Sequence, residues 1–228
     1  MTAAEKQPVI NPLPHPTRPT LLWTGFRYLM RIVFTIWLGY RARGAEKISP
    51  TGGGLLLINH QSFLDPLMAG LPFQRPVSYL ARDSLFAVFG LGWFLRKVYV
   101  MPISRKSAGA SSIRESVRRM KHGFLVGIFP EGTRSRDGKV GPMKSGFASL
   151  IRRGQVPIYP VGIAGTFEAM PRNAWLMRRR RVRVVYGDPL TIEELERYTQ
   201  RGREKELVSL VRDRIIDCQQ QADQWLNC

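Results

Sequence analysis

Two short polar segments, each directly after an apolar run, carry the residues best suited to chemistry. The first contains His60 and Asp65 and follows the run 55–58, Leu-Leu-Leu-Ile. A histidine near neutral pH accepts a proton, and a neighbouring carboxylate fixes its tautomer and stabilises the imidazolium that forms. The second segment, 129–135, reads Phe-Pro-Glu-Gly-Thr-Arg-Ser and combines a turn glycine, an acid and a cation. Together these residues predict an active site with His60 as the general base.

His60 and Asp65 can meet only if the chain bends sharply between them. On a helix, residues five apart point in different directions, and on a strand they lie roughly 16 Å apart on opposite faces. Asp65-Pro66 predicts the start of a helix, with Asp65 as the N-cap and proline at the first helical position. A carboxylate has two oxygens, so capping and orienting His60 are compatible. A plainer interpretation is that His60 is a satisfied polar residue at a strand end and that Asp65 is only a cap.

No residue near His60 is marked as a protein nucleophile. The sequence has no Gly-x-Ser-x-Gly elbow, and Ser62 shows no further sign of activation. We therefore expect the base to act on a hydroxyl group of the substrate. The two cysteines, Cys218 and Cys228, lie in the C-terminal segment and are too few for a disulfide scaffold, which predicts free thiols in a reducing compartment.

Apolar runs alternate with helical patterns from residue 52 onward. This predicts one α/β layered domain with a largely parallel central sheet flanked by helices. The expected strands are 54–59, 77–81, 98–103, 123–129, 157–163 and 181–186. Ligands bind such sheets beyond the carboxyl ends of the strands, where segments 59–65, 101–105 and 130–135 are expected.

Several local patterns refine this outline. Helices are expected to start at Pro66 and at a capping box made by Ser112 and Glu115, and to cover 144–153 and 203–226. The alternating segment 181–184, Arg-Val-Arg-Val, predicts a strand near a sheet edge with one basic face.

Residues 1–44 are predicted to be a Pro-rich arm followed by an amphipathic, membrane-associated helix. Five prolines lie within 7–19, which argues against a helix there. The longest apolar stretch, Leu21 to Tyr40, follows, and it carries one polar stripe made by Thr24, Arg27, Arg31 and Thr35. A helix lying in the membrane interface with its arginines toward the headgroups avoids the roughly 2.5–3.5 kcal/mol that each arginine costs in a spanning helix. Core packing is the second interpretation and a true span the third.

The chain is strongly basic, with 35 Lys+Arg against 17 Asp+Glu and a formal net charge of +18. Such charge attracts polyanions: an anionic membrane, nucleic acid or an acidic carrier protein. Because no nucleic-acid-binding motif is recognisable, anionic membrane lipids are the expected partner and nucleic acid is not. The competing hypothesis is a non-catalytic basic module for membrane or nucleic acid. It explains the four arginines at 178–181 but leaves His60 and Asp65 unexplained.

Four blocks, in order along about residues 50–190, resemble those of the 1-acyl-sn-glycerol-3-phosphate (lysophosphatidic acid) acyltransferases, the PlsC-like glycerolipid acyltransferase family. They are the His-x4-Asp segment 59–65, Pro-Ile-Ser-Arg at 102–105, Phe-Pro-Glu-Gly-Thr-Arg-Ser at 129–135 and Val-Pro-Ile-Tyr-Pro-Val at 156–161. Each block alone is weak. The first and third together, at this separation, are specific.

The resemblance implies an O-acyltransferase of phospholipid biosynthesis, with its glycerolipid acyltransferase domain at 45–228. It would move a fatty acyl group from acyl-CoA or acyl carrier protein to the sn-2 hydroxyl of lysophosphatidic acid and give phosphatidic acid, without a metal, a cofactor or an acyl-enzyme. Another lysolipid, such as a lyso-aminolipid, is the alternative acceptor. The expected location is the cytoplasmic face of the cell membrane. His60 and Asp65 would be catalytic, and the substrate would be bound by Arg105, Glu131, Gly132, Thr133, Arg134 and Lys144.

Overall fold

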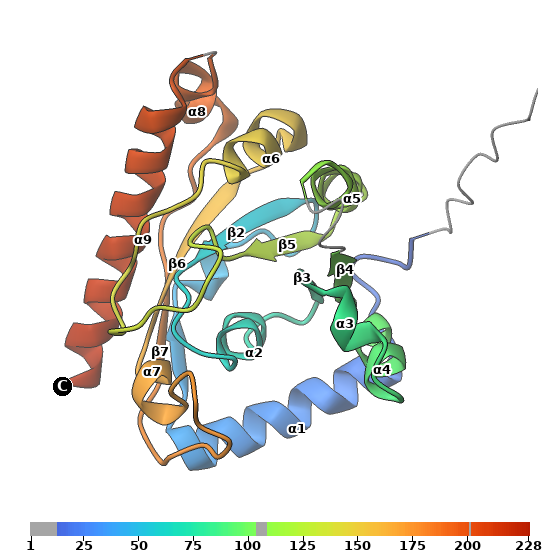
Figure 1. Ribbon diagram of the computed structural model, residues 1–228, viewed down its shortest axis with the longest axis vertical. Coiled ribbons are helices and arrows are strands. Elements are labelled where there is room, and N and C mark those ends of the chain that lie inside the picture. The colour runs from blue at the N-terminus through green and yellow to red at the C-terminus, as the bar shows by residue number, and fades with distance from the viewer. Residues whose placement is uncertain (1–12, 104–108, 201) are drawn as a thin grey trace, which may run out of the picture.

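A central β-sheet organises the chain. The structure, a computed structural model, describes residues 13–103, 109–200 and 202–228. Within them the strands pair in the order β1-β7-β6-β2-β5-β3-β4 (Figure 1). The pairings are parallel except that β7 runs antiparallel to β6, so the expected α/β fold with a largely parallel sheet is confirmed. The strands are β1 (Arg41–Arg43), β2 (Gly54–Ile58), β3 (Val77–Arg82), β4 (Met101–Ile103), β5 (Leu125–Ile128), β6 (Ile158–Ala164) and β7 (Arg183–Tyr186).

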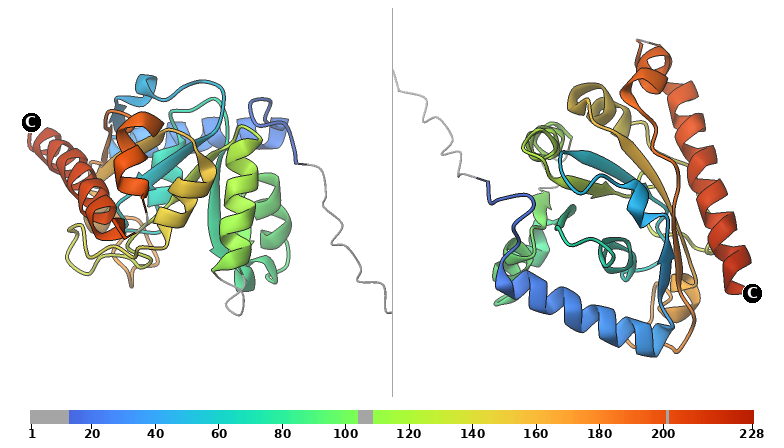
Figure 2. Two further views of the ribbon diagram at one scale, coloured as in Figure 1. Left: turned by 90° about the horizontal axis from the view of Figure 1, so that it is seen from above. Right: turned by 180° about the vertical axis from the view of Figure 1, so that it is seen from behind.

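Helices cover both faces of the sheet (Figures 1 and 2). One buried cluster joins the sheet to α1 (Leu21–Leu38) and α2 (Asp65–Gly70). A second cluster joins the opposite face to α5, α6, α8 and α9. The remaining helical bounds are α3 (Asp83–Phe86), α4 (Leu91–Lys97), α5 (Ala110–Lys121), α6 (Phe147–Gly154), α7 (Thr166–Ala169), α8 (Ile192–Thr199) and α9 (Glu204–Leu226), with a 3-10 turn at Ala45–Lys47.

Strand β2 explains why the strands read as unbroken apolar runs. Its side chains alternate between the two clusters: Leu56 and Ile58 pack toward α1 and α2, whereas Leu55 and Leu57 pack toward α6 and α9. All four are at most 1% exposed. Because both faces are covered, neither side of the strand tolerates polar residues. The strand ends at Ile58, and His60 follows two residues later at the carboxyl edge of the sheet.

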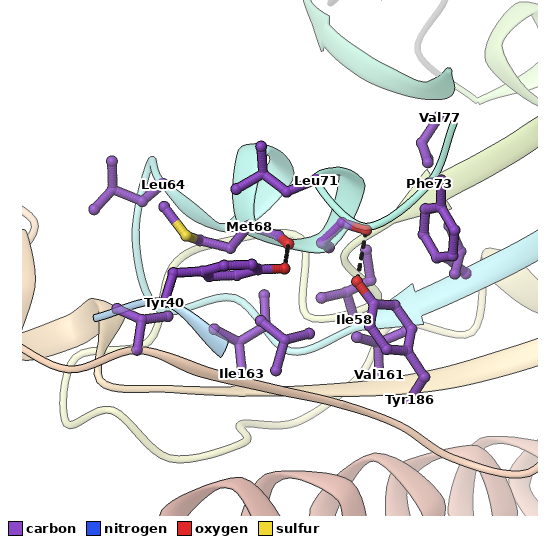
Figure 3. Close-up of a cluster of buried hydrophobic side chains, with 14 of the residues drawn as sticks. Tyr40, Ile58, Leu64, Met68, Leu71, Phe73, Val77, Val161, Ile163 and Tyr186 are labelled. Carbon is purple, nitrogen blue, oxygen red and sulfur yellow. Dashed lines mark hydrogen bonds between the residues drawn. The ribbon is translucent and has the colours of Figure 1, made fainter. Parts of the chain in front are cut away.

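Two buried tyrosines fasten α2, the helix that begins at Asp65. The Tyr40 hydroxyl donates to the Met68 carbonyl at 2.8 Å, and the Tyr186 hydroxyl donates to the Ala69 carbonyl at 2.9 Å (Figure 3). Burial raises the pKa of Tyr40 and Tyr186 well above the usual value, so both remain neutral donors. Leaving either carbonyl unpaired in this core would cost about 1–3 kcal/mol. These bonds therefore hold in place the helix that carries the candidate acid.

Helix α1 is amphipathic as expected, but the orientation predicted for its arginines was wrong for Arg27. That side chain is buried against the protein, donates to the Leu71 carbonyl at 3.3 Å and lies over the Tyr28 ring at 4.5 Å. Phe34 and Leu38 on the same face enter the core shared with α2. The protein-facing side thus includes one of the two arginines, because a backbone carbonyl and an aromatic ring contact its guanidinium there. The predicted boundary at residue 44 stays a prediction.

Two local predictions were wrong. Only Met101–Ile103 of the expected strand 98–103 forms β4, because Tyr99 adopts a left-handed backbone (φ 68°) and packs beside Trp23 and Phe124. Ser112 does not cap a helix. Helix α5 begins at Ala110, so Ser112 lies within its first turn and is buried.

The basic face predicted for 181–184 was also wrong. All residues of β7 are buried, and Arg183 is only 5% exposed. Its guanidinium donates to the Gly39 carbonyl at 2.7 Å and lies 5.1 Å from the centre of the Trp225 ring on α9. β7 does lie near an edge, since among the described residues only β1 lies beyond it, a strand that the sequence patterns did not predict. Helix α8 was not predicted either, although Thr191 and Glu194 form a capping box there.

Candidate active site

The sharp bend after β2 brings His60 and Asp65 together. His60 Nδ1 lies 2.8 Å from Asp65 Oδ2. The same oxygen accepts the backbone N–H groups of Gln61 at 2.6 Å and Ser62 at 2.7 Å. The carboxylate therefore faces back along the bend and does not cap its own helix as predicted; α2 has Leu64 before its first residue, with no side-chain cap. An ionised carboxylate only accepts hydrogen bonds, so Nδ1 carries the proton and Nε2 is left with its lone pair.

The second oxygen of Asp65 is held by a residue that the sequence did not reveal. Thr166, the first residue of α7, donates from Oγ1 to Asp65 Oδ1 at 2.7 Å. Both side chains are fully buried, whereas the His60 side chain keeps 18% of its surface exposed. Each carboxylate oxygen thus has a fixed donor, and only the imidazole of this group reaches solvent. A threonine after Gly165 carries no local signal for this role, because 101 residues separate it from Asp65.

The backbone of His60 is fixed by the 129–135 segment. Glu131 Oε1 accepts the His60 N–H at 2.8 Å, and the Ser135 N–H donates to the His60 carbonyl at 2.7 Å. Glu131 Oε2 accepts the Gly141 N–H at 3.0 Å, so both oxygens of this buried carboxylate have backbone partners. Burial raises the pKa of Glu131, while the two N–H donors act in the opposite direction. In this structure Glu131 contacts the backbone at the candidate base.

An aromatic ring sets the tilt of the imidazole. The ring of Phe129 stacks on that of His60 with centroids 4.1 Å apart and planes at 24°, and Tyr79 lies beyond it at 6.2 Å. Stacking and the Nδ1 bond to Asp65 together leave the ring little freedom to rotate. Phe129 was visible in the sequence as part of the motif, but its contact with His60 was not.

Two cations stand at the same loop. The Arg134 guanidinium lies 3.6 Å from the centre of the exposed Phe63 ring and donates to the Arg172 carbonyl at 3.3 Å. Desolvation, followed by the neighbouring Arg172, lowers the pKa of Arg134. The side chain of Lys144 is exposed, and its backbone N–H donates to the Pro130 carbonyl at 2.9 Å.

Gly132 permits the approach of Lys144 to the loop. Its φ is +68°, and a Cβ there would lie 2.9 Å from Lys144 Nζ. Thr133 beside it is exposed. Arg105, the remaining predicted substrate-binding residue, lies outside the described residues. Arg134 of the loop and Lys144, which packs against it, are therefore two cations near His60 that could bind an anionic group.

Ser62 is not arranged as a nucleophile. Its hydroxyl is buried and donates to the Met170 carbonyl at 2.8 Å. The site instead offers an imidazole held by an ionised carboxylate, with its second nitrogen free. Such a group takes a proton from a hydroxyl that arrives with the substrate. Fold and site together define an α/β enzyme of the general-base type.

Comparison with known proteins gives the family. The family model described as Acyltransferase matches residues 40–164, which is more than half of the chain and includes His60, Asp65 and the 129–135 segment. The chain belongs to this Acyltransferase family and is an O-acyltransferase, as the motifs predicted.

Similar proteins agree with this assignment. The 1-acyl-sn-glycerol-3-phosphate acyltransferase of Bacillus subtilis is 25% identical over 86% of this chain and 96% of its own length. A chloroplastic 1-acyl-sn-glycerol-3-phosphate acyltransferase of Brassica napus, BAT2, is 30% identical over 58% of this chain but only 39% of its own length. The crystal structure of the 1-acyl-sn-glycerophosphate (LPA) acyltransferase PlsC from Thermotoga maritima superposes with a TM-score of 0.72 at 24% identity, covering 89% of this chain and 79% of that one. The chain therefore shares its fold with that enzyme.

Proposed function

We propose that the protein transfers a fatty acyl group from an acyl thioester to the sn-2 hydroxyl of lysophosphatidic acid, giving phosphatidic acid. Two observations support this substrate. The similar proteins carry the name 1-acyl-sn-glycerol-3-phosphate acyltransferase, and one of them matches over nearly its whole length. The cations Arg134 and Lys144 next to the base suit a phosphate-bearing acceptor. The donor is acyl-CoA or acyl carrier protein, and the reaction takes no further cofactor.

The contact between His60 and Asp65 carries the proposed mechanism. His60 Nε2 takes the proton of the acceptor hydroxyl while that oxygen attacks the thioester carbonyl. The tetrahedral oxyanion collapses, the carbon–sulfur bond breaks, and the imidazolium returns the proton to the departing thiolate. A thiol with a pKa of about 8.5 leaves readily, so no acyl-enzyme is needed. Asp65, fixed by Thr166 and two backbone N–H groups, stabilises the imidazolium in between.

The proposed acceptor site lies at the 129–135 loop. Arg134 and Lys144 bind the phosphate, and Gly132 and Thr133 leave the backbone accessible to it. Arg105, which lies outside the described residues, is proposed to contribute a further cation to the phosphate. Glu131 acts indirectly, because both of its oxygens already accept backbone N–H groups. It is best described as a positioning residue that holds His60.

The lipid substrate requires contact with a membrane, and α1 supplies one. By length and composition this helix is apolar enough to cross a bilayer. Its inner face, however, packs on the domain through Trp23, Phe34 and Leu38, while Leu29 and Ile36 point outward. A helix held along the domain in this way lies in the interface, with its outer face among the lipids. The cytoplasmic face of the cell membrane is the proposed side, since acyl thioesters are the donors.

Acyl transfer by the purified protein tests the proposal. Incubation with lysophosphatidic acid and labelled acyl-CoA or acyl carrier protein should yield phosphatidic acid. His60→Ala should reduce the rate by at least about 100-fold, the lower range for loss of a general base, and leave vesicle binding intact. His122→Ala is the matched control, because His122 is exposed at the end of α5 and should retain full activity. Equal activity of the two variants would refute the assigned base.

The acceptor is tested separately from the chemistry. Lys144→Ala should raise KM for lysophosphatidic acid and leave the KM for an acceptor without phosphate unchanged, because the exposed ammonium contributes charge only. If both acceptors weaken equally, the phosphate site is wrong and another lysolipid becomes the better substrate. Vesicle binding by the wild type without any acyl transfer would favour the non-catalytic binding module.

A further inference from the structure

Exposed apolar side chains are unevenly distributed over the described residues. Of the large hydrophobic residues that are exposed there, all but Ile192 lie in four segments. Besides α1 these are the α3–α4 region, the loop 171–177 and Phe63 beside the candidate site. The most exposed are Phe89 (102%), Trp175 (95%), Leu21 (91%) and Leu176 (83%). Soluble surfaces rarely gather large apolar residues in this way unless something covers them.

Specific contacts connect these segments to the two ends of α1. Near the start of the helix, the ring of Phe26 packs edge-on against Phe94 of α4 with centroids 5.0 Å apart. Near its end, Trp37 Nε1 donates to the Met177 carbonyl at 3.4 Å. Figure 1 shows α1 running from α4 to the segment that follows α7. The apolar groups of α4 and of the loop 171–177 therefore extend the surface that begins on α1.

The loop 171–177 also touches the candidate site. Arg134 donates to the Arg172 carbonyl, and the Arg134 guanidinium covers the ring of Phe63. At its base the loop is closed by the Arg178 N–H, which donates to the Ala169 carbonyl at 2.7 Å. Closure at the base and contacts on both flanks hold its tip, Trp175 and Leu176, away from the core. One short loop thus joins the end of α1 to the acceptor side of the site.

The charge around this tip selects its partner. Arg172 precedes the tip, Arg178 to Arg181 follow it, and all five are exposed. No acidic residue occurs between Glu168 and Asp188. An apolar tip containing tryptophan above a ring of arginines matches the interface of an anionic bilayer, with rings among acyl chains and guanidinium groups at the headgroups.

We propose that the loop 171–177 inserts Trp175 and Leu176 into the anionic membrane beside the active site. Phe89 and Trp93 of the α3–α4 region form the second contact, at the other end of α1. The advantage of this placement rests on the proposed function, because a lipid acceptor that enters past Phe63 then reaches His60 without crossing water. The binding itself does not depend on which lipid is acylated.

Vesicle binding of the whole protein tests the proposal. Vesicles of phosphatidylcholine with and without phosphatidylglycerol are mixed with the wild type, with Trp175→Ala/Leu176→Ala and with the control Ile192→Ala, and bound protein is measured by flotation. The double variant should bind anionic vesicles at least about tenfold more weakly, because two large side chains lose burial in lipid. Ile192→Ala should bind like the wild type, since Ile192 lies on α8, outside the four segments.

A second measurement separates membrane contact from catalysis. Acylation of vesicle-embedded lysophosphatidic acid by the double variant should fall in parallel with binding. Acylation of a short-chain acceptor below its critical micelle concentration should not change. If both rates fall equally, the loop acts on the site through Arg134 and the proposal is overturned. If the wild type acylates neither acceptor, the proposed function fails while the binding comparison still decides this inference.

A label at the tip gives a readout in a folded protein. Leu176→Cys in a Cys228→Ser background, carrying an environment-sensitive dye, should show a blue shift on adding anionic vesicles; Cys218 is buried. Unchanged emission, or unchanged vesicle binding of the double variant, overturns the proposal. So does a wild-type dimer in solution that the double variant cannot form, because the tip would then bind a second copy of the chain.

Discussion

Replacing Thr166 by valine removes one buried hydroxyl of the site, whose oxygen lies 2.7 Å from Asp65 Oδ1 and 3.1 Å from Gln61 Oε1. Valine has nearly the shape of threonine, so no cavity opens, but Asp65 Oδ1 loses the donor that lies at 2.7 Å. A hydrogen bond to a charged group contributes about 1.5–3 kcal/mol, and here the carboxylate is fully buried and cannot recruit water easily. Oδ2 keeps its bonds to Gln61, Ser62 and His60, so the acid and the base stay in contact.

Both stability and turnover should respond to this change. A loss of about 1.5–3 kcal/mol lowers the Tm of a chain of this size by roughly 3–12 °C. Only the fraction of this free energy that orients His60 affects the stability of the transition state. We therefore expect kcat to fall by about tenfold, which corresponds to about 1.4 kcal/mol. The KM for the acceptor should not change, because Thr166 is fully buried and has no surface toward a substrate.

Thiol release from acyl-CoA at saturating acceptor measures kcat, and thermal unfolding measures Tm. Thr166→Ser is the matched control, since it restores the hydroxyl and loses only a methyl group. It should recover most of kcat. If serine behaves like valine, packing of the methyl group explains the effect and the hydrogen bond does not. If valine behaves like the wild type, Asp65 needs no donor on Oδ1 and the account of the site is wrong.

Two further predictions concern ionisation. Burial raises the pKa of Glu131, so the folded protein holds this proton to higher pH than the unfolded chain, whose carboxyl titrates near 4.5. The stability that Glu131 contributes should therefore decline as pH rises from about 4. Denaturant titrations across pH should show the wild type losing stability relative to Glu131→Gln. A constant difference in the free energy of unfolding between the two proteins would contradict the raised pKa. Burial also raises the pKa of the Cys218 thiol to about 11, whereas Cys228 is exposed. A thiol reagent near pH 8 should modify one cysteine quickly in the native protein and both after unfolding, and two fast thiols in the native state would show that the packing around Cys218 is looser than described.

The sequence alone determined the parts of this protein that depend on neighbouring residues. Unbroken apolar runs predicted strands covered on both faces, and β2, β5 and β6 are such strands. The spacing of His60 and Asp65, with Pro66 after them, predicted a bend that could bring the two side chains together. These signals are local because periodicity, turn chemistry and motif spacing act within a few residues.

The tertiary structure decided which distant groups complete the site. Glu131 lies 71 residues from His60, and Thr166 lies 101 residues from Asp65. Crossover connections place the carboxyl ends of β2, β5 and β6 side by side, so segments far apart in sequence meet at one edge of the sheet. The burial of Arg27 and Arg183 was decided in the same way, because the carbonyls of Leu71 and Gly39 and the ring of Trp225, which contact their guanidinium groups, come from other elements. A chain's local pattern can name a base and its acid, but the groups that hold them are selected only when the sheet assembles.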